Sequence, residues 1–103
     1  MGNWRGGARM GIANATWPFA TLRASSEALV LEVMFFGSFR FSPAQVVDVE
    51  PYYSLLIVGR GVRIRHSVSE YPETLIFWCF VEPKGVVAEL KRLGYGRVVE
   101  GLG

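Results

Sequence analysis

The stretch that decides the fold is TLIFWCFVEPKGVVAELKRLG, residues 74–94. Its first half is a run of aromatic and branched apolar residues, and this predicts a strand over 74–80. Pro83 suits the first turn of a helix, and Gly94 is a typical residue just past a helix end. Between them, one apolar stripe at helical spacing is formed by Val86, Val87, Leu90 and Leu93. The stretch therefore predicts a strand followed by the only convincing helix of the chain.

The sequence before this stretch consists of short apolar runs separated by turn residues. In one run, Val47 and Val49 alternate with Asp48 and Glu50, which is typical of a half-buried strand. Runs of this kind predict six further strands, over residues 17–24, 28–36, 39–41, 46–52, 55–58 and 62–66. The tripeptide at 59–61, Gly-Arg-Gly, is expected to be the hairpin turn between the last two.

The two ends of the chain lack such patterns. Residues 1–15 hold four glycines and no periodicity, and we expect a flexible N-terminal leader. Residues 16–94 form the predicted domain, and residues 95–103 are expected to be a glycine-rich C-terminal tail. A total of 103 residues suits one domain with a single core.

Composition and charge exclude several classes of protein. The net charge is +2, and residues 1–15 hold Arg5 and Arg9 without any acidic residue, so the remaining body is formally neutral. A neutral body argues against nucleic-acid binding, which usually needs a concentrated basic face. The single cysteine, Cys79, excludes an internal disulfide and cysteine-based zinc sites, and it favours a reducing compartment such as the cytoplasm.

Neither the histidine nor the cysteine has the partners that catalysis requires. His66 shares a strand face with Val62 and Ile64, and no nucleophile or orienting carboxylate is indicated beside it. Cys79 lies in an apolar strand, where we expect it to be buried and inert. The sequence therefore predicts no enzyme, no metal site and no cofactor.

The order of seven short strands followed by one amphipathic helix resembles the pleckstrin-homology-like (PH-like) fold. Small bacterial proteins with PH-like domains are similar in sequence pattern. The resemblance covers about residues 16–94 and rests on GRGVRIRH, TLIFWCF and the capped helix VVAELKRLG. It implies a mainly β domain, in which a bent, seven-stranded antiparallel sheet forms an open barrel and the C-terminal helix plugs one end.

The resemblance does not extend to a phosphoinositide site. Lipid-binding members of this family carry several basic residues around the first hairpin loop. With the strands predicted above, that loop is 24–28, which holds Glu27 and is flanked only by Arg23. The final helix also lacks the tryptophan that is typical of eukaryotic members, since Trp78 precedes it.

Two surfaces are candidates for binding. Arg60, Arg63 and Arg65 form a basic cluster that could hold an anionic group, or could simply be a solvated face that protects a strand edge. The same cluster, with Trp4, Arg5 and Arg9 of the leader, would serve a membrane-surface binder.

The second candidate is the strand over 74–80, which is apolar on both faces. A strand of this kind needs cover on both sides. If neither the helix nor the leader covers it, a hydrophobic patch is left that marks an interface. The interface residues would be Ile76, Phe77, Trp78 and Phe80, with Trp78 or Phe77 as the anchor. The leading prediction is thus a self-associating protein-interaction module, and the alternative is a binder of anionic ligands or acidic lipid.

Overall fold

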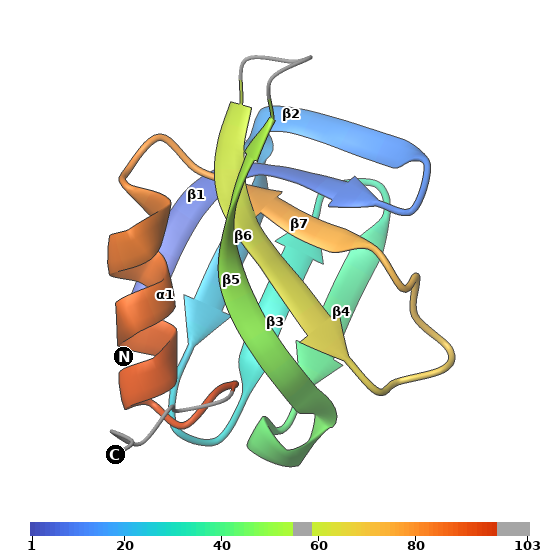
Figure 1. Ribbon diagram of the computed structural model, residues 1–103. Coiled ribbons are helices and arrows are strands. Elements are labelled where there is room, and N and C mark those ends of the chain that lie inside the picture. The colour runs from blue at the N-terminus through green and yellow to red at the C-terminus, as the bar shows by residue number, and fades with distance from the viewer. Residues whose placement is uncertain (55–58, 97–103) are drawn as a thin grey trace.

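The computed structural model describes residues 1–54 and 59–96, in which seven antiparallel strands form one curled sheet with a single C-terminal α-helix (Figure 1). The elements follow one another as β1 (Gly2–Met10), β2 (Ala13–Ala24), β3 (Leu29–Val33), β4 (Gly37–Phe41), a 3-10 turn (Pro43–Gln45), β5 (Val46–Ser54), β6 (Gly59–His66), β7 (Leu75–Trp78) and α1 (Pro83–Arg92). The predicted fold class, mainly β with seven antiparallel strands and one helix, is confirmed.

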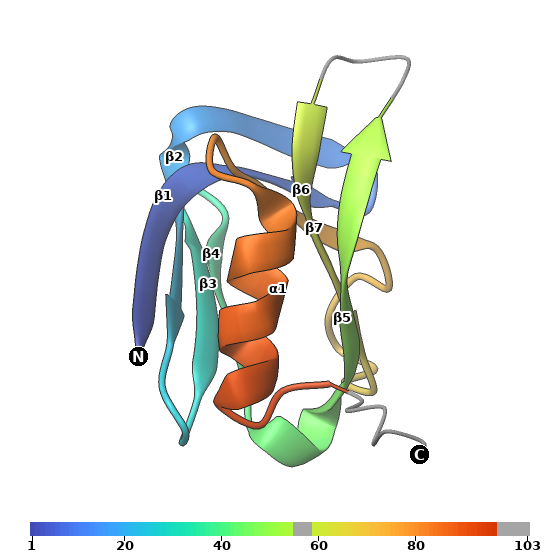
Figure 2. The same cartoon turned by 60° about the vertical axis from the view of Figure 1, so that its left-hand side comes forward.

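The strands run across the sheet in the order β4-β3-β2-β1-β7-β6-β5. The first strand therefore lies at the centre, between β2 and β7, and the edges are β4 and β5. The sheet curls around α1, which covers its open side and packs against β5 and β6 (Figure 2). The largest fully buried side chains come from both halves of the sheet and from the C-terminal segment: Leu22, Phe41, Phe77, Leu90 and Tyr95.

The helix follows the prediction closely. Glu82 is its N-cap, Pro83 occupies its first turn, and Leu93 is its C-cap. Gly94 follows with φ +106°, a left-handed conformation that glycine adopts without strain. The predicted stripe faces the sheet: three of its residues are buried and Leu93 is partly buried against the core. Lys91 and Arg92 lie in the last turn, where positive charge is favourable.

The prediction of a flexible N-terminal leader is wrong, because residues 2–10 form the central strand β1. The glycines there permit close packing between strands. A Cβ on Gly6 would lie 1.8 Å from the carbonyl oxygen of Trp78, and one on Gly7 would lie 2.4 Å from that of Ala15. Only residues without a side chain fit at these two positions, where the register with β2 shifts.

Three further expectations require correction. Residues 59–61 are not a hairpin turn, because they pair with Tyr52, Tyr53 and Ser54 within the β5–β6 ladder. The predicted strand over 28–36 ends at Val33, and residues 34–36 form a turn. Tyr95, assigned to the tail, is fully buried, and its hydroxyl donates to the carbonyl oxygen of Ser25 at 2.6 Å. The predicted strand over 55–58 lies outside the described residues.

Candidate functional site

The predicted interface on the outer face of β7 is covered within the chain at Ile76. Ile76 lies opposite Arg9 of β1 and Arg63 of β6, so these long side chains flank it on the same face of the sheet. It is only 2% exposed. Phe77 points to the other face and is fully buried in the core, so its predicted role as a surface anchor is wrong. Of the predicted leader, Arg9 is the residue that lies beside Ile76.

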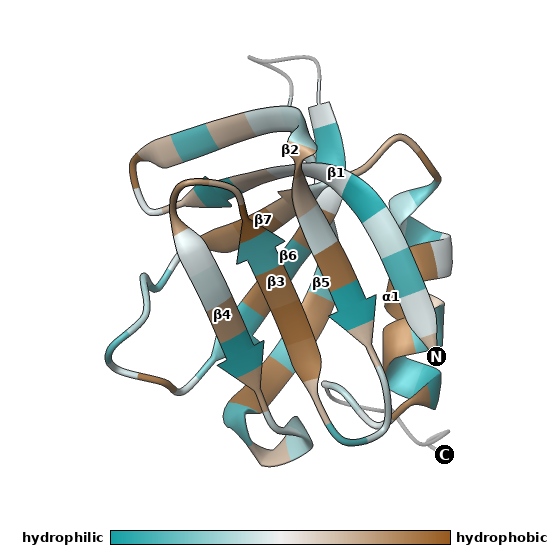
Figure 3. Ribbon diagram, turned by 180° about the vertical axis from the view of Figure 1, so that it is seen from behind, coloured by the Kyte–Doolittle hydropathy of each residue, from teal (hydrophilic) through white to brown (hydrophobic). Residues whose placement is uncertain are grey.

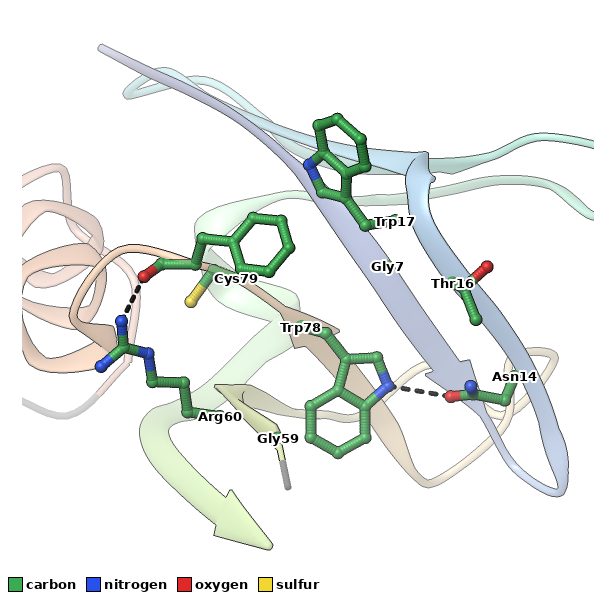
Figure 4. Close-up of a pocket in the computed structure, with 9 residues that line it drawn as sticks. Gly7, Asn14, Thr16, Trp17, Gly59, Arg60, Trp78 and Cys79 are labelled. Atoms are coloured by element: carbon green, nitrogen blue, oxygen red, sulfur yellow. Dashed lines mark hydrogen bonds between the residues drawn. The ribbon is translucent and has the colours of Figure 1, made fainter. Parts of the chain in front are cut away.

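Trp78 is half-buried and held by specific contacts. Its indole Nε1 donates to Oδ1 of Asn14 at 2.8 Å (Figure 4). Its ring lies 5.9 Å from that of Tyr52. Asn14 comes from β2 and Tyr52 from β5, so the indole joins both halves of the sheet across its outer surface. Of the four predicted interface residues, Trp78 and Phe80 keep exposed apolar surface.

Phe80 and Trp17 line an apolar cleft. Figure 2 shows that β1 and β2 bend sharply together. Trp17 lies on β2, and Phe80 lies in the connection between β7 and α1. Their rings are 5.6 Å apart, yet Trp17 is 52% exposed and Phe80 68%. Together with Trp78 they wall a cavity of about 270 Å³, here called the corner cleft. The sequence carries no sign that Trp17 lies beside Phe80, because this position depends on the pairing of β1 with β7.

The floor of the corner cleft depends on residues without side chains. Gly7 of β1 and Gly59 of β6 both line it (Figure 4). The guanidinium of Arg60 at its rim donates to the carbonyl oxygen of Phe80, which fixes the chain just before the helix. Cys79 also lines the cleft, and its thiol points to the carbonyl oxygen of Val81 at 3.4 Å.

The prediction that Cys79 is buried is confirmed. Desolvation by burial is the main cause that raises the pKa of its thiol to about 11, so the thiolate is scarce at neutral pH.

The imidazole of His66 is held by two hydrogen bonds to the backbone. The backbone amide of Val68 donates to its Nδ1 at 3.1 Å, and its Nε2 donates to the carbonyl oxygen of Pro72 at 2.8 Å. Both ring nitrogens are therefore engaged by the backbone.

The arginine cluster is not assembled into one site. Arg63 and Arg65 share a strand face, whereas Arg60 lies on the opposite face, at the rim of the corner cleft. Arg65 forms an ion pair with Glu50 at 3.0 Å, which occupies its guanidinium. The Nε of Arg63 is buried and has no hydrogen-bond partner among the described residues. Three free guanidinium groups that converge on one anion are therefore not present in the part of the chain described.

The basic residues of the first strand are also separated. Trp4 packs partly against the core, and Arg9 donates to the carbonyl oxygen of Gly11. The true first hairpin is the turn at Gly11 and Ile12, not residues 24–28, and Arg9 is the only basic residue directly before it. A mobile basic leader that touches a membrane is therefore not what these residues form.

Comparison with known proteins adds no constraint. No family model, curated protein or solved structure matches this chain. In the described residues no helix is both long and apolar enough to cross a bilayer. Within the same ranges, no three His, Cys, Asp or Glu side chains come together as a metal site.

Proposed function

We propose that this chain is a non-enzymatic, PH-like protein-interaction module of the cytoplasm that self-associates through the corner cleft. The observation that carries the proposal is the pair of aromatic side chains at the cleft mouth, Trp17 and Phe80, which keep more than half of their surface exposed. Large aromatic side chains dominate the energetics of protein interfaces because they bury much apolar area with little loss of conformational freedom.

The PH-like assignment is supported by architecture alone. A curled sheet of seven antiparallel strands with a C-terminal helix across its open side is what the resemblance implies. The non-enzymatic assignment rests on the settings of His66 and Cys79, because a backbone-bound imidazole and a buried thiol offer no activated base or nucleophile. The lone buried thiol also suits a reducing compartment.

The size of the cleft favours a side chain over a small molecule as its occupant. Pockets for drug-sized ligands are usually about 300–1,000 Å³, whereas the corner cleft measures about 270 Å³. Its aromatic walls carry one cationic group, Arg60, whose guanidinium is already bonded to the backbone of Phe80. An apolar side chain from a protein surface fits this chemistry better than a charged metabolite.

The test is the mass of the chain in solution, measured by light scattering at high micromolar concentration. We expect a mass above that of one chain for the wild type, and a lower mass for Phe80→Ser. Val47→Ser is the matched control, because Val47 is also an exposed apolar residue but lies on β5 and does not line the cleft. A wild-type chain that stays monomeric at this concentration would refute the proposal.

A further inference from the structure

The turn between β3 and β4 exposes three consecutive large apolar side chains, Met34, Phe35 and Phe36. Figure 3 shows this turn in the colours of hydrophobic residues. Phe35 is 91% exposed and has φ +73°, a conformation that bulky residues seldom adopt. The turn is closed by the Phe36 amide, which donates to the carbonyl oxygen of Val33 at 3.0 Å. The fold therefore holds an aromatic side chain outward at the tip of a short, well-defined hairpin.

This tip is continuous with the corner cleft. The amide of Met34 donates to the carbonyl oxygen of Phe19 at 2.8 Å, and Phe19 follows Trp17 by two residues on β2. Trp17 in turn contacts Phe80. The exposed apolar residues along this path, here called the corner strip, are Phe80, Trp17, Phe19, Met34 and Phe35.

The corner cleft is too small to form the whole interface of a stable dimer. Specific interfaces bury about 800 Å² on each partner, far more than two aromatic side chains can supply. The proposed self-association therefore needs further apolar surface next to the cleft. The corner strip adds three exposed apolar side chains next to the cleft: Phe19, Met34 and Phe35. Its concave end is the cleft, and its convex end is the hairpin tip.

We propose that two copies of this chain associate about a two-fold axis near Phe19, with Phe35 of each copy inserted into the corner cleft of the other. This inference rests on the proposed self-association and names its contact surface. A two-fold interface uses the same patch on both copies, so a strip with a tip at one end and a cleft at the other is self-complementary. The ring of Phe35 then lies against Trp17 and Phe80, and the contact occurs twice in each dimer.

Charge does not oppose this arrangement. Arg5 lines the depression beside the tip and forms no ion pair with any described residue, whereas Glu32 in the same depression is paired with Arg23 at 2.7 Å. Beyond the cleft of the facing copy, Glu82 follows Phe80 by two residues and is exposed. An unpaired cation on β1 thus lies beside the tip, and the segment next to the cleft carries a carboxylate that accepts from Tyr53. The cation at the cleft itself, Arg60, is bonded to the carbonyl oxygen of Phe80.

The first experiment measures the dimer dissociation constant by analytical ultracentrifugation for Phe35→Gly. Glycine suits φ +73°, so this variant removes the ring without straining the turn. Loss of two buried aromatic rings per dimer should weaken association by about a hundredfold or more. An unchanged constant, in a wild type that does dimerise, would overturn the tip-in-cleft contact and leave the proposed self-association standing.

The second experiment mixes the tip variant Phe35→Gly with the cleft variant Phe80→Ser. Each is expected to be monomeric alone, and the mixture should form a heterodimer, because one intact tip then meets one intact cleft. A mixture that stays monomeric while both variants remain folded by circular dichroism would overturn the proposal. So would binding of the wild type to anionic vesicles that Phe35→Gly abolishes without any change in mass, since the tip would then belong to a lipid surface.

Discussion

Strand β7 and the turn at residues 34–36 are both apolar runs, but β7 is largely buried and the turn is exposed. β7 lies between β1 and β6, and even its outward-facing Ile76, which lies opposite Arg9 and Arg63, is only 2% exposed. The turn lies next to the edge strand β4, and its side chains are exposed. The difference shows that an apolar run becomes core or surface according to its neighbours in the sheet, which its own sequence does not reveal.

The largest expected effect on stability comes from a change in β1, the strand that pairs with β7. Gly6→Ala would place a Cβ 1.8 Å from the Trp78 carbonyl oxygen, so β1 and β7 could not keep their spacing. We expect a loss of about 3 kcal/mol or more in the free energy of unfolding, measured by urea denaturation. Gly85→Ala is the control, since a Cβ on this exposed helical glycine meets nothing within 4 Å. It should stabilise the chain by up to about 1 kcal/mol, and equal effects of the two changes would contradict this packing.

The next largest effect comes from comparing truncation of the buried Ile76 with truncation of the exposed Phe80. Ile76→Ala removes a side chain that is 2% exposed and should cost about 2 kcal/mol. Phe80→Ala removes a larger side chain that is 68% exposed, and the expected change is within about 0.5 kcal/mol. Thermal unfolding of dilute protein, where association is negligible, measures both. A greater loss for Phe80→Ala would mean that the corner strip is structural in the single chain.

The same contrast explains what could be predicted from the sequence. The helix was predictable because its stripe, its proline and its terminal glycine are local signals that agree with one another. Strands such as β5 and β6 were predictable from their alternation. The central strand β1 was not, because Gly6 and Gly7 are the residues expected of a loose terminus as well as of a tightly packed crossing. Only the partners Trp78 and Ala15 distinguish the two.

The candidate site was predictable only in part. The surplus of apolar residues around 76–80 was visible, and Phe80 and Trp78 do line the corner cleft. Trp17 was not linked to them, since its contact with Phe80 joins residues far apart in the sequence. The arginine cluster does not form the single anion site that the sequence suggested. Strand alternation places Arg60 on the other face of β6 from Arg63 and Arg65, and Glu50 pairs with Arg65.

A smaller effect concerns the indole that joins the two halves of the sheet. Asn14→Ala removes the acceptor of the Trp78 indole, and we expect a loss of about 1 kcal/mol. Asn3→Ala is the control, since Asn3 is also an exposed asparagine in the β1–β2 pair but makes no side-chain hydrogen bond with the described residues. If the two variants unfold at the same urea concentration, the indole bond does not contribute to stability.

The smallest effect is a pH dependence beside the corner cleft. The Tyr53 hydroxyl donates to Oε2 of Glu82 at 2.5 Å, which lowers the pKa of Glu82 and raises that of Tyr53. A carboxyl whose pKa is lower in the folded state stabilises the fold above its unfolded pKa, near 4.3, and loses this contribution as pH falls through the folded value. A phenol with a raised pKa loses its contribution as pH rises above about 10.

The stability difference between wild type and Tyr53→Phe should therefore be greatest between about pH 5 and pH 9, and should shrink on both sides of that window. Glu82→Gln should remove the acid-side change, because a glutamine at the helix N-cap does not titrate. Both groups are exposed, so the difference stays small compared with that of Ile76→Ala. A difference that is constant across the whole pH range would mean that the hydroxyl bonds to something other than this carboxylate. The β7–α1 connection, which carries Phe80, would then be fixed to the sheet chiefly by Arg60.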